Sequence, residues 1–273
     1  MDTATFDLST SYEVTPAQIA RFRHDGHILL REVASREEIH HFGPLITDCV
    51  DRLALARDAR VRLEDESTLF IEATNVWQKS EEIREFVFAR RFARIAAELL
   101  DVRAVRLYHD QATIKEPGGT STPWHKDHYH WPLATHSTLK MWLALSEITQ
   151  DMGVLVFASG SHHGGLFPEV PFRLNFQEIF SRVIRERNVP TPSYSQKPGD
   201  AVFYSGQVLH SALENSSTRR REALGVIYYP DGTRVMIPEH NHREMDMRQY
   251  LPGLKPGDLA GTGLNPVLYD AGG

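Results

Sequence analysis

The chain has 273 residues, 41% hydrophobic and 24% charged, which is enough to bury the core of one large globular domain. Its net charge of −6 provides no broad basic surface, so nucleic acid is not an expected partner. The single cysteine, Cys49, cannot form an intrachain disulfide, which is typical of proteins in a reducing compartment.

The first ten residues contain two aspartates and no apolar run, unlike a signal peptide. No later segment approaches the ~20 consecutive apolar residues that span a bilayer. We therefore expect a cytoplasmic protein without a membrane partner.

Residues up to about 100 have the caps and the periodicity of helices. A capped start at Thr15-Pro16 and a capping box at Ser35 predict two helices, the second running to about Leu55. The dipeptide Gly43-Pro44 predicts a kink or a break in that second helix. A strand, a polar segment and two further helices are expected at 27–33, 58–67, 81–88 and 91–100.

Beyond residue 101, short strands separated by Gly and Pro dominate the pattern. They are predicted at 102–115, 139–145, 153–157, 201–204, 208–212 and 221–229, with one helix at 176–187. Residues 235–273 are rich in Pro and Gly and are predicted to wrap the body as loop. Helices followed by many short strands predict a β sandwich or barrel supported by N-terminal helices.

The first of these strands places His109, Gln111 and Thr113 on one face. Such a polar face is usually exposed to solvent. Because this strand leads into the turn that precedes His125, the alternative is that its polar face lines a polar cavity.

The pair His125-x-Asp127 is the strongest chemical signal in the chain. An imidazole and a carboxylate two residues apart point to the same side of an extended segment. With a distant histidine they form the 2-His-1-carboxylate triad, which holds iron(II) by one face and leaves about three positions open. The alternative is a chance occurrence or a solvated turn. Bulky, rigid neighbours favour a sheltered metal cavity: Pro123, Trp124, Tyr129, Trp131 and Pro132.

His210 is the best candidate for the third ligand, because it ends an apolar strand that follows the turn Pro198-Gly199-Asp200. The paired histidines His162 and His163 are the next candidates. Their glycine-rich setting indicates a turn first.

Arg221 opens the last predicted strand and shares its face with Ala223 and Gly225, which leave space beside the guanidinium. A guanidinium binds a carboxylate through two parallel hydrogen bonds. We therefore predict a carboxylate-binding role for Arg221, and a solvated turn for Arg219 and Arg220.

Together these residues resemble the phytanoyl-CoA dioxygenase family of iron(II)/2-oxoglutarate oxygenases, from about residue 14 to residue 232. The resemblance is specific for cofactor chemistry and says little about the substrate. One departure is Lys126, where the family often has glutamine. The shared motifs are Phe22-x-x-Asp25-Gly26-His27-Ile28-Leu29, His125-x-Asp127, Trp142, Gly160-Ser161-His162, Pro198-Gly199-Asp200, His210 and Arg221.

The resemblance implies a mainly β fold with N-terminal helices, namely a double-stranded β-helix (a cupin-like jelly roll). We expect one domain over 1–273, with a helical part at about 14–100, a β-helix core at about 102–232 and a C-terminal wrap at 233–273. By the same resemblance, Arg221 pairs with the distal carboxylate of 2-oxoglutarate, and Gln111 and Trp142 line the cosubstrate site. The implied iron(II) ligands are His125, Asp127 and His210.

The implied activity is that of a dioxygenase that uses O2 to oxidise, most simply to hydroxylate, a small organic metabolite or natural product, with release of succinate and CO2. Two rivals remain. One is a cupin-like metal enzyme without 2-oxoglutarate, which would not need Arg221. The other is a catalytically silent β-helix protein used for binding or sensing.

Substrate contacts are expected from the residues that follow Asp127. Their mixture of rings and hydrogen-bonding groups suits a small, partly polar or ring-containing molecule better than a long alkyl chain. The predicted pocket wall consists of His128, Tyr129, His130 and Trp131.

Overall fold

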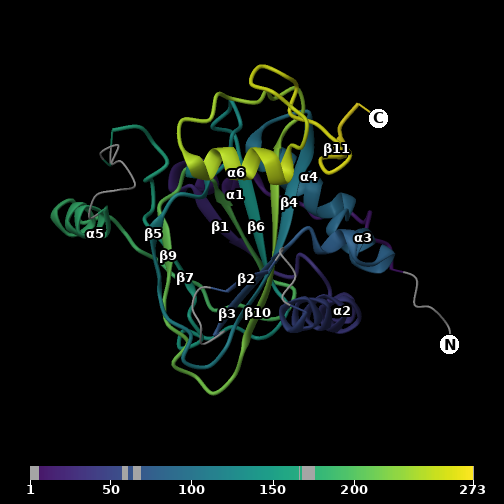
Figure 1. Cartoon of the computed structure of the whole chain (residues 1–273). Helices are drawn as coiled ribbons and strands as arrows, with labels where there is room; N and C mark the ends of the chain where they lie inside the picture. The colour runs from purple at the N-terminus through teal and green to yellow at the C-terminus, as the bar shows by residue number, and fades with distance from the viewer. Residues whose placement is uncertain (1–5, 57–60, 64–68, 166, 168–175, 273) are drawn as a thin grey trace.

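The structure is a computed structural model that describes residues 6–56, 61–63, 69–165, 167 and 176–272. Two antiparallel sheets face each other in it (Figure 1). The larger has the strand order β1-β8-β6-β10-β4-β3-β2, with β11 also paired to β4, and the smaller has the order β5-β9-β7. This arrangement confirms the predicted jelly roll.

The strands of the large sheet are β1 (His27–Leu30), β2 (Val61–Leu63), β3 (Phe70–Thr74), β4 (Ala104–Lys115), β6 (Leu139–Ala144), β8 (Ala201–Ser205), β10 (Arg221–Pro230) and β11 (Val267–Asp270). Those of the small sheet are β5 (Thr122–His125), β7 (Leu155–Phe157) and β9 (His210–Ala212). The helices are α1 (Pro16–Asp25), α2 (Arg36–Leu55), α3 (Glu81–Val87), α4 (Arg90–Leu100), α5 (Phe176–Glu186) and α6 (Asn241–Tyr250), with short 3-10 turns η1 (Val76–Gln78) and η2 (Asp127–Tyr129).

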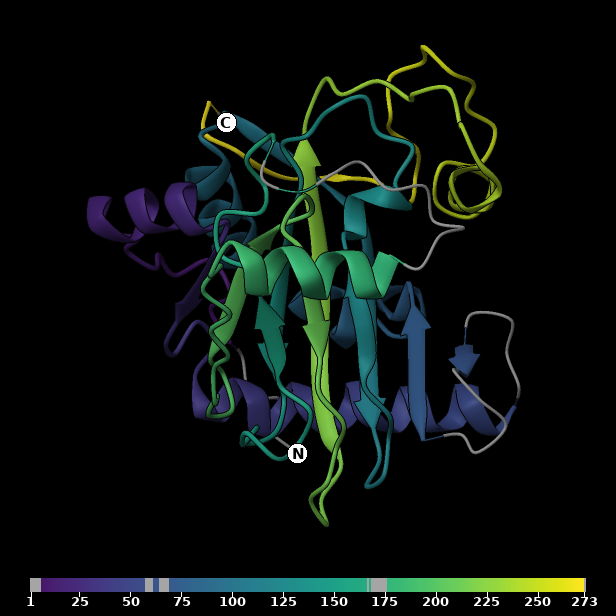
Figure 2. The ribbon, with the colours of Figure 1, turned by 90° about the vertical axis from the view of Figure 1, so that its left-hand side faces the viewer.

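The helices α2, α3 and α4 pack on the face of the large sheet that is turned away from the small sheet (Figure 1). Apolar side chains of these helices and of the sheet form the main core there, with Phe86, Phe92 and Ile46 fully buried. On the opposite side of the molecule, α5 crosses the outside of the small sheet (Figure 2). The space between the two sheets contains a second apolar cluster, which includes Trp142, Phe157 and Tyr204, and polar side chains beside it.

Both predicted helix starts are confirmed as capping boxes. The Ser35 hydroxyl accepts a hydrogen bond from the Glu38 backbone at 3.1 Å, and the Glu38 carboxylate accepts one from the Ser35 backbone at 2.7 Å. Of the two outcomes predicted at Gly43-Pro44, the break is wrong, because α2 runs unbroken through Pro44, and the kink stays a prediction. Phe42, Gly43 and Ile46 are buried in this stretch, and their packing holds the helix together despite the proline.

The strand predictions between 102 and 229 are confirmed to within a few residues. The predicted polar segment at 58–67 lies outside the described residues except for β2, which pairs with β3. Among the described residues, no helix combines the length and the apolar character needed to cross a membrane.

The C-terminal segment is not only loop, so that prediction is wrong. Val267 pairs with Arg106 where β11 joins the edge of β4, and α6 lies across one end of the sheets (Figure 1). Arg248 and Glu244 form an i,i+4 ion pair in α6 at 3.0 Å. Only Tyr250 of this helix is buried. A helix that is polar on nearly all sides has no apolar periodicity for a sequence pattern to detect.

Candidate metal centre

His125, Asp127 and His210 form a compact cluster at one end of the small sheet. His125 ends β5 and His210 begins β9, and the two face each other in the antiparallel register, with ring centroids 4.2 Å apart. Lys126 has an extended backbone, so side chains still alternate there and Asp127 points to the side of His125. The three ligand atoms lie within 4.8 Å of one another.

Hydrogen bonds to backbone carbonyls orient both imidazoles. Nδ1 of His125 donates to the Pro123 carbonyl at 2.8 Å, and Nδ1 of His210 donates to the Val208 carbonyl at 3.2 Å. A ring that donates through Nδ1 carries its lone pair on Nε2. Both Nε2 atoms face Oδ1 of Asp127, at 3.5 Å for His125 and 3.8 Å for His210. Three electron-pair donors therefore converge from one side, which is the arrangement that a facially bound metal requires.

Asp127 is held by its other oxygen. Oδ2 accepts a hydrogen bond from the Tyr204 hydroxyl at 3.2 Å and one from Lys140 Nζ at 3.5 Å. Burial alone would raise the pKa of Asp127, but the nearby Lys140, followed by His210, outweighs burial and holds it well below its ordinary value. Burial lowers the pKa of His210 to about 3, which keeps its imidazole neutral. Neutral imidazoles and an ionised carboxylate are the forms that bind a cation.

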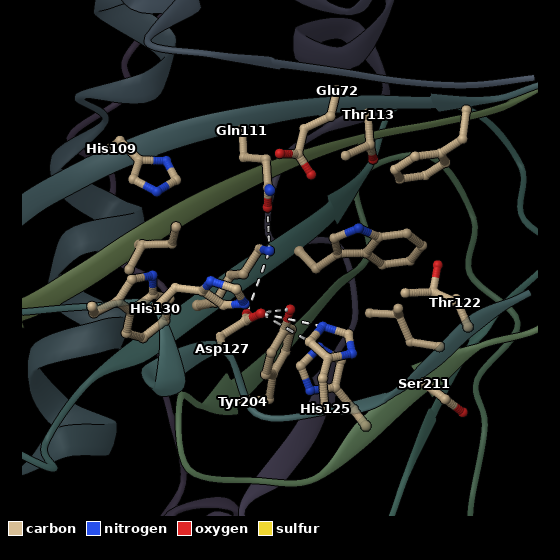
Figure 3. A pocket seen from close by; sticks show the side chains of 18 of the residues that line it. Glu72, His109, Gln111, Thr113, Thr122, His125, Asp127, His130, Tyr204 and Ser211 are labelled. Atoms are coloured by element: carbon tan, nitrogen blue, oxygen red, sulfur yellow. Dashed lines mark hydrogen bonds and ion pairs between the residues drawn. The ribbon is translucent and has the colours of Figure 1, made fainter. Parts of the chain in front are cut away.

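The cluster opens into a cavity of about 280 Å³ between the two sheets. Gln111 and Trp142, the predicted cosubstrate residues, both line it, as do His109 and Thr113 from the same face of β4. The polar face of this strand thus lines a cavity, which was the second of the two alternatives. Figure 3 shows His109 and His130 on one side of Asp127, with Thr122 and Ser211 on the other.

Arg221 forms one end of this cavity, which we call the Arg221 end. Its side chain is 2% exposed, and its guanidinium lies 5.2 Å from the Trp142 ring and 6.0 Å from the Phe70 ring. It donates to the carbonyl of Gly153. The fully buried Lys115 is its register partner on β4, so two cations stand side by side at this end.

The other two arginines of the run lie outside the cavity lining. Arg219 is exposed and pairs with Glu147 at 3.0 Å. Arg220 is partly buried and pairs with Asp51 at 2.8 Å, which ties the turn to α2. Arg221 differs from both because β10 begins with it and turns it inward.

The predicted substrate wall divides into two pairs. His130 and Trp131 line the cavity, whereas His128 and Tyr129 are not part of its lining. His128 is buried beside Thr138, and Tyr129 stacks on His240 with centroids 4.1 Å apart. In the 3-10 turn η2, residues three apart share a side, so His130 follows Asp127 to the cavity and the two between them turn away. Substrate contact by His128 and Tyr129 stays a prediction.

Sequence reasoning missed several lining residues. Lys140 stands in an apolar strand on the same side as Trp142, and this was a signal that could have found it. Asp246 and Tyr250 come from α6, which the sequence pattern did not predict. Glu72 comes from β3, and its polar character among apolar neighbours was a weak signal.

The paired histidines of the glycine-rich turn are not part of the cluster of possible metal ligands in the described part of the chain. His162 Nε2 lies 3.0 Å from the Arg23 carbonyl, and His163 Nε2 lies 3.2 Å from the His24 carbonyl. Both histidines thus attach this turn to α1.

A jelly roll whose cavity contains two histidines and one carboxylate as possible metal ligands is typical of non-haem iron oxygenases. A comparison with family models leads further: the model of the phytanoyl-CoA dioxygenase family matches residues 22–223. The chain belongs to the phytanoyl-CoA dioxygenase family. This confirms the predicted family.

Individual relatives are distant. A phytanoyl-CoA dioxygenase of Arabidopsis thaliana is 27% identical over 158 residues, which cover 52% of this chain and 50% of that protein. The chain spans about half the length of the first curated relatives it matches.

Solved structures show the same fold over nearly the whole chain. The carbocyclase SnoK of nogalamycin biosynthesis has a TM-score of 0.77 at 23% identity, covering 93% of this chain and 96% of that one. EctD of S. alaskensis, solved with 2-oxoglutarate and 5-hydroxyectoine, has a TM-score of 0.72 at 20% identity, covering 93% and 91%.

The cofactors of this family are iron(II), 2-oxoglutarate and O2, and the cavity suits them. The three converging donor atoms suit a divalent cation that keeps open positions. The buried guanidinium of Arg221 in the same cavity suits the second carboxylate of a dicarboxylic acid.

Proposed function

We propose that the protein is an iron(II)- and 2-oxoglutarate-dependent dioxygenase that hydroxylates a small organic metabolite or natural product and releases succinate and CO2. One observation carries the proposal: a single cavity contains both the His-Asp-His cluster and the buried Arg221 guanidinium. A cupin-like metal enzyme without 2-oxoglutarate has no need of a buried cation at that place. A silent binding protein has no need of three oriented metal ligands.

Each residue has a distinct task in this proposal. His125, Asp127 and His210 bind the metal from one side and leave the cavity side open. Arg221 binds the distal carboxylate of 2-oxoglutarate, and the ring of Trp142 beside it excludes water from that ion pair. When bound, iron, 2-oxoglutarate and O2 supply the oxidising chemistry.

Tyr204 and Lys140 are positioning residues for Asp127. Both donate to Oδ2, which leaves Oδ1 toward the metal position and favours binding through one oxygen. Lys140 also donates to the side-chain oxygen of Gln111, so one ammonium group connects the metal ligand to the wall of the cavity.

Hydroxylation is the simplest outcome, and whether it occurs depends on the position of the substrate relative to the metal. A C–H bond held beside the metal is the first requirement for any oxidation of this class. The fold is compatible with other outcomes, since the similar SnoK is a carbocyclase.

The test is to incubate the purified protein anaerobically with iron(II) and 2-oxoglutarate and then admit O2. We expect the visible charge-transfer band of a 2-oxo acid chelated to iron(II), followed by slow succinate formation even without substrate. The cupin-like alternative predicts bound iron without that band. The silent alternative predicts no succinate, and either result would contradict the proposal.

A further inference from the structure

The cavity extends from the Arg221 end to a second end, which is lined by α6 and which we call the α6 end. Lys140 of β6 lines the same cavity, and its side chain is 9% exposed. Dashed lines in Figure 3 mark its contacts, which run from Gln111 through the ammonium group to Asp127. An enclosed ammonium group thus lies beside the metal position.

The sheet leaves room for the Lys140 side chain at one glycine. Gly225 of β10 pairs with Trp142 of β6 on one side and with Gln111 of β4 on the other. The lysine passes over this glycine on its way from β6 to Gln111, and a Cβ atom at Gly225 would lie 2.9 Å from Cε of Lys140. That distance is too short for two carbon atoms in contact, so any other residue at this position would displace the ammonium group.

The ammonium group can donate one more hydrogen bond. Nζ of a lysine carries three protons. Lys140 donates one to the side-chain oxygen of Gln111 and one to Oδ2 of Asp127 at 3.5 Å. These two atoms are its acceptors in the described part of the chain, so the third proton is available to a ligand in the cavity.

Metal binding changes the charge balance around Lys140. Asp127 is the carboxylate within ion-pair distance of its Nζ among the described residues. A divalent cation at the three ligand atoms offsets the charge of Asp127. The enclosed ammonium group then needs a further anion, because an enclosed charge without a counter-charge is unfavourable.

The cosubstrate brings such an anion to the metal. 2-Oxoglutarate has a carboxylate at each end, and the 2-oxo acid end is the one that chelates iron. The distal carboxylate is assigned to Arg221, which opens β10 at some distance before Gly225 on the same strand. The other carboxylate therefore arrives next to Lys140, and each end of the dianion meets a different cation.

We propose that Lys140 is a second cosubstrate-binding residue, whose ammonium group donates a charge-assisted hydrogen bond to the metal-chelating carboxylate of 2-oxoglutarate. The inference rests on the proposed function for the orientation of 2-oxoglutarate, with its distal carboxylate at Arg221. Lys140 and Tyr204 both contact Asp127, but they act differently on the metal. A cation repels the metal, whereas a neutral hydroxyl does not.

Two matched probes test the proposal by calorimetry on the iron(II)-loaded protein, kept anaerobic. N-oxalylglycine is an unreactive analogue of 2-oxoglutarate with both carboxylates, and N-methyloxamate is the same molecule without the distal carboxylate. Lys140→Met should weaken the binding of both probes by a similar factor, at least about tenfold, because a hydrogen bond between charged groups is lost. Arg221→Met should weaken the binding of N-oxalylglycine alone.

Two further variants separate the position of the charge from general damage. Gly225→Ala keeps the lysine but displaces its side chain, so it should also weaken the binding of both probes. Lys197→Met is the matched control, because Lys197 is exposed and is not part of the cavity lining. It should change neither affinity. The iron affinity of Lys140→Met, measured by competition with a chelator, should stay the same or rise.

Unchanged binding of N-methyloxamate in Lys140→Met or in Gly225→Ala would overturn the proposal, as would no binding of either probe to the unaltered protein. A parallel loss of iron affinity in Lys140→Met would overturn it too, because the lysine would then act only through Asp127.

The succinate assay of the unaltered protein separates the two proposals. Succinate together with unchanged probe binding in Lys140→Met overturns this inference alone. The expected pattern of probe binding without succinate overturns the proposed function alone.

Discussion

The Arg221 end and the α6 end of the cavity differ in origin, burial and charge. The Arg221 end is built by neighbouring strands of the large sheet, inside the region that matches the family model, and its two cations are almost completely buried. The α6 end is closed by a helix beyond that region, and its carboxylate Asp246 is only half-buried. Strand register thus fixes the position of Arg221, while α6 closes the other end of the cavity.

This division has a physical reason. A sheet positions its side chains through backbone hydrogen bonds, which depend little on side-chain identity. A helix that is polar on nearly all sides is held by a few contacts, such as Tyr250 on His109, and these can change without unfolding the sheets. The metal cluster lies in the same cavity, between the two ends.

The largest expected effect comes from removing the shared centre. His210→Ala deletes one of three metal ligands, so the iron content of the purified protein and succinate formation should both fall to background. His162→Ala is the matched control, since His162 contacts α1 and lies outside the cluster. Stoichiometric iron and near-normal turnover in His210→Ala would disprove the triad.

The next effect should be confined to the Arg221 end. Arg221→Met leaves the distal carboxylate without its buried partner, which typically costs ~3–5 kcal/mol. At ~1.4 kcal/mol per tenfold, the apparent KM for 2-oxoglutarate should rise by on the order of a hundredfold or more, with iron content unchanged. Arg221→Lys should rescue this only in part, because an ammonium lacks the planar two-pronged contact.

Arg219→Met and Arg220→Met are the controls for this measurement, since both side chains pair outside the cavity lining. Equal and small effects of all three substitutions on succinate formation would remove the support for 2-oxoglutarate binding at Arg221.

A smaller effect is expected on metal binding itself. Tyr204→Phe removes the 3.2 Å hydrogen bond to Oδ2 of Asp127 but keeps the ring. Loss of such a supporting contact typically weakens metal binding by ~10-fold, and competition with a chelator would measure it. The affinity for N-oxalylglycine, measured at saturating iron, should stay as it is. A change in that affinity would show that Tyr204 acts on the cosubstrate directly.

The smallest effect should be confined to the α6 end. Tyr250→Phe retains the ring that stacks on His109 and loses the 3.3 Å hydrogen bond to Thr74. A hydrogen bond between neutral groups contributes about 1 kcal/mol, so the free energy of unfolding, measured by urea denaturation, should fall by a similar amount. The affinity for N-oxalylglycine should not move, and a parallel loss there would mean that the two ends are not independent.

The sequence by itself predicted the family, the jelly roll and the members of the metal cluster. The family and the jelly roll followed from the shared motifs. Two properties of strands indicated the site residues: alternation puts His125 and Asp127 on one side, and small residues after Arg221 leave space beside its guanidinium. Capping boxes such as that of Ser35 also act locally, within four residues. Patterns that extend over so few residues can be recognised in the sequence without any knowledge of the tertiary contacts.

Tertiary structure alone decided the rest. The 3-10 turn after Lys126 determines that His130 faces the cavity and that His128 does not, because it replaces the period of a strand by a period of three. The continuity of α2 through Pro44 and the existence of α6 depend on what these helices pack against. Asp246 joins the cavity through contacts with residues more than a hundred positions earlier, such as Tyr108. Distant contacts of this kind leave no periodic pattern in the sequence, since only the packed sheets bring the partners together.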